Sequence, residues 1–106
     1  MPLILSANRL QYQNLSKINL KRVIYFESIS RKIRAIEKDN VTEFYQKLDY
    51  IEKQLEAAGF LRIHQSYMVN QLFVSFVNTS EIVMEYGIRL PVSKKYVQKI
   101  RDTFRL

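Results

Sequence analysis

The chain has no cysteine, no long apolar run and very little glycine or proline. The absence of cysteine excludes disulfide bonds and thiolate metal sites, and it fits a reducing compartment such as the cytoplasm. Two glycines and two prolines leave no flexible linker or low-complexity segment inside the chain. No apolar run approaches the roughly 18 residues of a membrane span, and no basic region precedes an apolar one as in a signal peptide. We therefore predict a cytoplasmic protein without membrane contact.

The composition is that of one globular domain with an excess of positive charge. Of 106 residues, 47% are apolar and 25% are charged, which is enough for a modest core. Seventeen basic against ten acidic residues give a net charge of +7. The excess lies in residues 1–40 and 71–106, whereas residues 41–70 are nearly neutral. This pattern favours two separate basic contacts with one polyanionic partner; the alternative is a basic surface that only maintains solubility.

The N-terminal part predicts short strands followed by an amphipathic helix. Val23–Phe26 and Ile33–Lys38 read as a hairpin with Arg31 and Lys32 near its tip. The apolar pieces Leu3–Ser6 and Leu10–Tyr12 indicate an edge strand or a tail.

A change to helical spacing then predicts a helix over 42–58 that covers a sheet. Its apolar stripe consists of Phe44, Leu48, Ile51 and Leu55. Thr42 is the expected N-cap, and Gly59 stands where a left-handed C-cap belongs.

The C-terminal part predicts a second hairpin and a short final helix. Leu72–Val77 and Glu81–Tyr86 flank an Asn-Thr-Ser turn, and Ile88–Leu90 is a brief strand that stops at Pro91. A helix over 94–104 should follow.

Ser93 is the expected N-cap of that helix, and Lys94 and Lys95 fall in its first turn. Cations are disfavoured there by the helix dipole, which makes sense if a phosphate occupies the same position. The alternative is a simple cap followed by solvated lysines.

The stretch 60–70 (F-L-R-I-H-Q-S-Y-M-V-N) holds the only histidine, His64, in a polar turn between apolar anchors. A lone histidine is often a buried ring that bonds to backbone. Beside Arg62, Gln65 and Ser66, however, it would belong to a donor-rich patch that suits phosphates and base edges.

Catalysis, metal binding and cofactor binding have little support. Ser66 and His64 form a Ser–His pair in sequence, but no orienting acid or oxyanion hole is signalled. One histidine without a carboxylate cluster at ligand spacing does not predict a metal site. No glycine-rich phosphate loop or dinucleotide motif is present, so we expect no cofactor and no enzyme.

Four blocks of this sequence resemble the LytTR-type (LytR/AlgR) DNA-binding domain, the output domain of many bacterial response regulators. They are V-I-Y-F-E-S (23–28), E-F-Y-Q-K-L (43–48), the 60–70 stretch and L-P-V-S-K-K-Y (90–96). The third is the most specific, because F-x-R-x-H-x-S-(Y/F)-x-V-N is the family's hallmark. The resemblance spans about 3–104, within a single domain over 1–106.

The resemblance implies a mainly β fold: an elongated array of short antiparallel sheets with one packed helix and a short C-terminal helix. It also implies binding to double-stranded DNA through loops that enter successive grooves. Arg31, Gln65 and Lys95 match the family's base-contacting positions. The expected contacts with the DNA backbone are Lys32, Arg62, His64, Ser66, Ser93 and Lys94.

Two positions depart from the family pattern. Relatives often carry Arg or Asn where Gln65 stands, and Arg-Arg or Arg-Lys where Lys94 and Lys95 stand. Lysine is less able than arginine to make a bidentate contact with guanine, so base preference does not transfer from relatives.

The expected function is therefore sequence-specific DNA binding in transcription regulation. The expected partners are direct-repeat promoter sites, on which the domain could dimerise, and a receiver domain or sensor-kinase pathway upstream. The alternative is a non-catalytic interaction domain for an acidic or membrane-bound partner.

Overall fold

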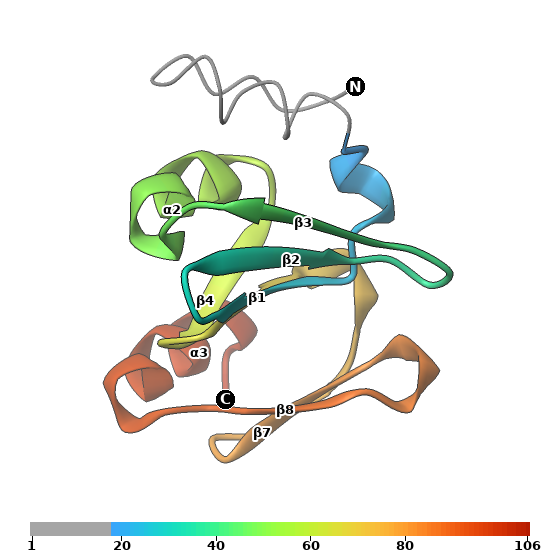
Figure 1. The fold of residues 1–106 in the computed structure, drawn as a ribbon. Coiled ribbons are helices and arrows are strands. Elements are labelled where there is room, and N and C mark those ends of the chain that lie inside the picture. The colour runs from blue at the N-terminus through green and yellow to red at the C-terminus, as the bar shows by residue number, and fades with distance from the viewer. Residues whose placement is uncertain (1–17) are drawn as a thin grey trace.

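The computed structural model describes residues 18–106, which form two antiparallel sheets, two α-helices and four short 3₁₀ helices (Figure 1). The predicted apolar pieces Leu3–Ser6 and Leu10–Tyr12 lie outside the described residues. In chain order the elements are η1 (Leu20–Arg22), β1 (Tyr25–Ile29), β2 (Lys32–Ile36), β3 (Val41–Tyr45), α2 (Leu48–Ala57), β4 (Phe60–His64), β5 (Tyr67–Asn70), η2 (Gln71–Phe73), β6 (Val74–Val77), β7 (Glu81–Met84), η3 (Glu85–Gly87), β8 (Arg89–Pro91), η4 (Lys94–Tyr96) and α3 (Val97–Phe104). The predicted mainly β fold with two helices is confirmed.

The larger sheet has five strands in the order β3-β2-β1-β5-β4, and every pair is antiparallel. The predicted first hairpin is its β1–β2 pair, in which Phe26 lies opposite Ala35. Strand β4 is buried along nearly its whole length, because both faces of the sheet are covered where it lies. The two strands of the hallmark stretch thus lie mostly in the interior, whereas the turn between them reaches the surface.

The helix predicted over 42–58 is wrong in its first part. Val41–Tyr45 forms the edge strand β3, and α2 begins only at Leu48. Phe44 is buried in the same core as Leu48, so a spacing of four matched a helix stripe although the two residues belong to different elements. The helix ends as predicted, with Gly59 at a φ of +94° in the left-handed region that glycine adopts readily.

The predicted N-cap at Thr42 is also wrong, since that residue lies within β3. The residue before the helix, Lys47, makes no side-chain cap. Its backbone N–H instead donates a 2.8 Å hydrogen bond to Oε1 of the Gln46 side chain.

Two hydrophobic cores lie on opposite faces of the five-stranded sheet. The first is enclosed by α2 and by residues 18–23, and its members include Phe26, Phe44, Phe60, Ile51 and Leu55. The second is enclosed by the three-stranded sheet and α3, and it includes Ile24, Ile63, Val69, Ile82, Met84 and Ile100. The larger sheet is therefore the central layer of the domain, which Figure 1 shows between α2 and the β7–β8 layer.

The smaller sheet has the order β6-β7-β8 and contains the second predicted hairpin. Its turn is held by Asn78, whose Oδ1 accepts hydrogen bonds from the N–H groups of Ser80 (2.8 Å) and Glu81 (2.9 Å). Such a side-chain turn is a common use of asparagine. Strand β7 ends at Met84, because Tyr86 and Gly87 have φ values of +69° and +76° and turn the chain.

The C-terminal helix begins later than predicted. Residues 94–96 form the 3₁₀ helix η4, and α3 starts at Val97. The Ser93 side chain makes no cap hydrogen bond, so the predicted N-cap is wrong. The apolar face of α3 points into the second core as expected, with Ile100 fully buried. Among the described helices, none is both long and apolar enough to cross a membrane.

Candidate nucleic-acid interface

Three turns that carry the predicted contact residues lie along one side of the domain, on the left in Figure 1. We call them turn 1 (Ser30–Arg31, between β1 and β2), turn 2 (Gln65–Ser66, between β4 and β5) and turn 3 (Ser93–Tyr96, before α3). Backbone bonds hold them together. The Ser28 N–H donates to the Ser66 carbonyl (2.8 Å), and the Ser93 N–H donates to the Ile63 carbonyl (3.1 Å).

Turn 1 presents Arg31 to solvent. The turn is tight because Ser30 has a φ of +48°. Lys32, the next residue, behaves differently: its Nζ lies 3.6 Å from Glu43 Oε1 and 5.4 Å from the centre of the Tyr45 ring. Arg31 is therefore the free cation of this turn, whereas Lys32 already has a carboxylate partner.

Turn 2 follows a β-bulge in β4. Arg62 lies opposite Met68 and His64 opposite Tyr67, so Ile63 is the extra residue on this strand. A bulge removes one residue from the ladder, and here it directs the Ile63 carbonyl to the Ser93 N–H of turn 3. The bulge thus connects the hallmark stretch to the C-terminal lysines.

His64 is half-buried, and its ring is fixed within turn 2. Its Nδ1 accepts a 3.0 Å hydrogen bond from the backbone N–H of Ser66, and its ring centre lies 5.3 Å from that of Tyr67. A ring that accepts at Nδ1 carries its proton on Nε2, the nitrogen that is left to donate to a ligand. The contact uses the Ser66 backbone rather than its hydroxyl, which differs from the arrangement of a catalytic Ser–His pair.

Gln65 is exposed at the tip of turn 2, whereas Arg62 is not a surface residue. The Arg62 side chain is only 3% exposed, and it bonds to Asp49, Glu52 and two carbonyl groups of its own hairpin. The prediction that Arg62 contacts the DNA backbone is therefore not supported. A buried guanidinium requires such partners, and here they occupy four of its five N–H groups.

Turn 3 presents Lys94 and Lys95 as exposed cations. Lys95 Nζ lies 5.5 Å from the centre of the Tyr96 ring, a cation–π distance. Both lysines belong to η4 and precede α3, so they are not in the first turn of an α-helix as predicted. The half-buried Ser93 contributes its backbone N–H to the link with β4.

A depression of about 530 Å³ joins turns 1 and 2. It is lined by Ser28, Ser30, Arg31, Tyr45, Gln46, Lys47, Leu48, Asp49, Arg62 and Gln65. The sequence does not single out Lys47, because this residue falls inside the helix predicted over 42–58. Once β3 ends at Tyr45, the loop before α2 places Lys47 beside Arg31 and Gln65.

The basic residues of the described chain divide into paired and unpaired groups. Those in ion pairs with carboxylates are Arg22, Lys32, Arg34, Arg62, Arg89 and Lys99. Between residues 18 and 106, nine basic residues form no such pair: Lys21, Arg31, Lys38, Lys47, Lys53, Lys94, Lys95, Arg101 and Arg105. Four of these nine, Arg31, Lys47, Lys94 and Lys95, belong to the turns or to the loop before α2. The side with the three turns therefore has cations free to meet an anionic ligand.

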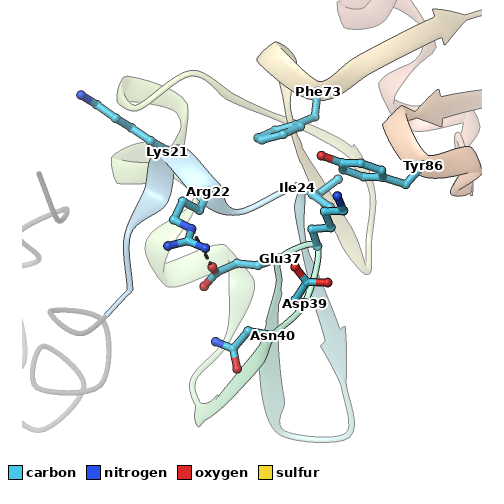
Figure 2. Close-up of a pocket in the computed structure, with 9 residues that line it drawn as sticks. Lys21, Arg22, Ile24, Glu37, Asp39, Asn40, Phe73 and Tyr86 are labelled. Carbon is cyan, nitrogen blue, oxygen red and sulfur yellow. Dashed lines mark ion pairs between the residues drawn. The ribbon is translucent and has the colours of Figure 1, made fainter.

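The opposite end of the domain has a smaller hollow of about 240 Å³, shown in Figure 2. Its lining mixes charges of both signs, and Arg22 is paired with Glu37 at 3.5 Å. Lys38 lies 5.2 Å from the centre of the Tyr86 ring. Because its acidic and basic groups offset one another, this end suits a polyanion less well than the side with the three turns.

Tyr25 of β1 and Tyr67 of β5 have perturbed ionisation. Burial raises the pKa of Tyr25 and of Tyr67 above the ordinary value of 10.0, and the Glu27 carboxylate raises both further. The Tyr67 hydroxyl donates a hydrogen bond to Glu27 Oε2 at 3.5 Å. The rings of Tyr25 and Tyr67 pack edge to face, with their centres 6.1 Å apart. Both tyrosines are thus neutral at physiological pH, and Tyr67 also packs against the His64 ring.

The chain belongs to the LytTR family. The family model described as the LytTr DNA-binding domain matches residues 13–105. The fold agrees with this, because it is a small, mainly β domain with three linked turns that carry exposed cations. No group of three or more potential metal ligands occurs within residues 18–106.

Several curated relatives are called "Sensory transduction protein LytT". The one from Bacillus anthracis is 24% identical over 101 residues, which cover 89% of this chain and 40% of that protein. The one from Bacillus subtilis is 26% identical over 84% of this chain and 39% of that protein. The one from Enterococcus faecalis is 28% identical over 78% of this chain and 37% of that protein. The chain thus spans about two fifths of the length of these relatives.

A solved structure shares the fold. The LytTr DNA-binding domain of a response regulator from Bacillus cereus superposes with a TM-score of 0.74. It is 22% identical, and the match covers 84% of this chain and 86% of that one. At this identity the likeness establishes the architecture, and it confirms the fold expected from the resemblance.

Proposed function

We propose that this domain binds double-stranded DNA in a sequence-specific manner and regulates transcription. It would act in the bacterial cytoplasm as the output module of a two-component response regulator. The observation that carries the proposal is the arrangement of Arg31, Gln65 and Lys95 on three linked turns of one side. All three side chains are exposed, and they differ in the base edges that they can bind.

In the proposed complex, each of the three side chains binds a different kind of base edge. Arginine is suited to the two acceptors of guanine and glutamine to adenine, whereas lysine binds guanine as a point donor. Arg31 and Lys95 would reach major-groove edges, and Gln65 the segment between them. The described domain measures 39 Å along its longest axis, close to one turn of duplex DNA, which is about 34–36 Å.

The contacts with the DNA backbone are proposed for residues with free donors near these turns. They are Lys94, Lys47, the Nε2 of His64 and the hydroxyl groups of Ser66 and Ser93. Lys32 would contribute only by exchanging its carboxylate partner for a phosphate. Contacts of this kind set affinity and orientation rather than sequence preference.

The partners of the longer protein are also proposals. Relatives extend well beyond the matched region, so a receiver domain or sensor-kinase pathway would act upstream of this module. Direct-repeat promoter sites would place two copies side by side on the same face of the duplex, as a dimer on DNA.

Selection from random duplex DNA tests the proposal. A defined motif should emerge, and binding to it should weaken with salt. If about six phosphates are neutralised, log K falls against log salt with a slope of about −5. Absence of any enriched motif, or a slope near zero, would refute the proposal. Binding to an acidic protein without any binding to DNA would favour a protein-interaction domain instead.

A further inference from the structure

We propose that Arg62 is a positioning residue that fixes turn 2 and turn 3 in one arrangement, so that Gln65 and Lys95 read DNA as a unit. This inference rests on the proposed DNA-binding function and adds to it a residue that does not touch the DNA. Arg62 is buried beneath the two turns and is not exposed at the surface.

The bonds of Arg62 join α2 to turn 2. Its Nη1 donates to Asp49 Oδ1 (2.9 Å) and Glu52 Oε1 (2.7 Å), both on α2. Its Nε donates to the carbonyl of His64 (2.8 Å), and its Nη2 donates to the carbonyl of Gln65. The Gln65 backbone is thus tied to a helix on the far side of the guanidinium. A planar fork with five N–H groups can meet these four acceptors at once, which an ammonium group cannot.

The same guanidinium also contacts turn 3. Its Cζ lies 5.9 Å from the centre of the Tyr96 ring, within cation–π range. Tyr96 adjoins Lys95, and the backbone bond from Ser93 to Ile63 anchors the other end of turn 3 one residue from Arg62. A shift of the guanidinium would therefore displace both turns.

This geometry predicts an effect on sequence preference rather than on general DNA affinity. Attraction to phosphates depends mainly on the free cations, which a change at Arg62 leaves in place. A base contact depends on fixed donor positions, and mobile turns would lose it. Arg62→Lys keeps the buried positive charge but loses the fork.

The test compares Arg62→Lys with Arg89→Lys as a matched control. Arg89 also pairs with a carboxylate, that of Glu81 at 2.7 Å, but its side chain is 66% exposed and lies on the three-stranded sheet. Dissociation constants are measured for the selected site and for an unrelated duplex. Amide hydrogen exchange is followed at Ser66 and Ser93, whose N–H groups donate to His64 Nδ1 (3.0 Å) and to the Ile63 carbonyl (3.1 Å).

For Arg62→Lys, the preference for the selected site should fall at least about fivefold, the lower bound for one lost base contact. Affinity for the unrelated duplex should stay within about twofold, exchange at Ser66 and Ser93 should accelerate, and Arg89→Lys should match the wild type. A destabilised variant with unchanged preference and unchanged exchange would overturn the proposal, because Arg62 would then be merely structural.

A second variant covers the case in which Arg62→Lys does not fold. Tyr96→Leu leaves the four hydrogen bonds of Arg62 in place and removes its contact with turn 3, together with the contact between Lys95 and the Tyr96 ring. Faster exchange at Ser66, in the other turn, with a lower preference would support the coupling, and no change in either would overturn it. If the wild type itself shows no sequence preference, the proposed function fails. The exchange data then decide separately whether Arg62 fixes the turns.

Discussion

Lys47 offers a sharp test of where the DNA lies, because the structure gives it a matched control. It lines the depression with Arg31 and Gln65, and its Nζ lies 5.7 Å from the centre of the Tyr50 ring. Lys53 is also exposed, belongs to α2 and does not line that depression. Neither lysine has a carboxylate partner within residues 18–106. Lys47→Gln and Lys53→Gln therefore remove the same charge from different places.

The magnitude follows from counterion release. Each lost phosphate contact makes the salt slope shallower by about 0.9, and over a fourfold change in salt it is worth about 3.5-fold in affinity. Lys47→Gln should therefore reduce a slope of about −5 to about −4. Lys53→Gln should leave the slope nearly unchanged, because its charge lies farther from the DNA and is screened.

The assay is fluorescence anisotropy with a labelled duplex, measured at several salt concentrations for the wild type and both variants. Thermal unfolding of each protein provides the control for folding. Equal slopes for the two variants would refute the placement, since net charge alone would then account for the loss. A larger effect of Lys53→Gln would place the DNA on the outer face of α2.

Two further predictions concern stability. Asn70 is buried, and its side chain bonds to the carbonyls of Leu20 and Val23 and to the N–H of Leu72, so Asn70→Ala should cost about 2–4 kcal/mol in denaturant unfolding. Asn78→Ala, which opens an exposed turn, should cost about 1 kcal/mol, and equal costs would contradict this ranking. The pKa values of Tyr25 and Tyr67 are raised above 10.0 in the folded protein. Their contribution to the free energy of unfolding is therefore complete below pH 10 and declines as pH rises through the folded-state pKa values. Replacing both by phenylalanine should flatten the loss of stability above pH 10, and an unchanged pH profile would refute it.

The sequence predicted the structure correctly where a residue pattern is compatible with only one kind of local structure. Alternating and β-branched segments predicted both hairpins, and the apolar anchors of the hallmark stretch are buried as expected, Met68 and Val69 completely. Gly59 predicted the end of α2 because a left-handed cap nearly requires glycine. These features are local, so short windows of sequence suffice to find them.

Tertiary contacts decided the features that the sequence did not predict. Phe44 sits four residues before Leu48, and burial of both in one core imitates a helix stripe although β3 pairs with β2. The burial of Arg62 depends on Asp49 and Glu52, which lie ten or more residues away. No local pattern separates an arginine that faces DNA from one that is held by distant carboxylates.

The most direct test of the central claim is a selection from random duplex DNA carried out in parallel with wild type, Arg31→Ala, Gln65→Ala and Lys95→Ala. If three turns read three parts of one site, each variant should lose preference at a different block of positions. Those blocks should follow the order of the turns along the domain, with about 1–3 kcal/mol lost per base contact. Motifs that stay identical to that of the wild type while all affinities fall together would contradict base reading by these residues.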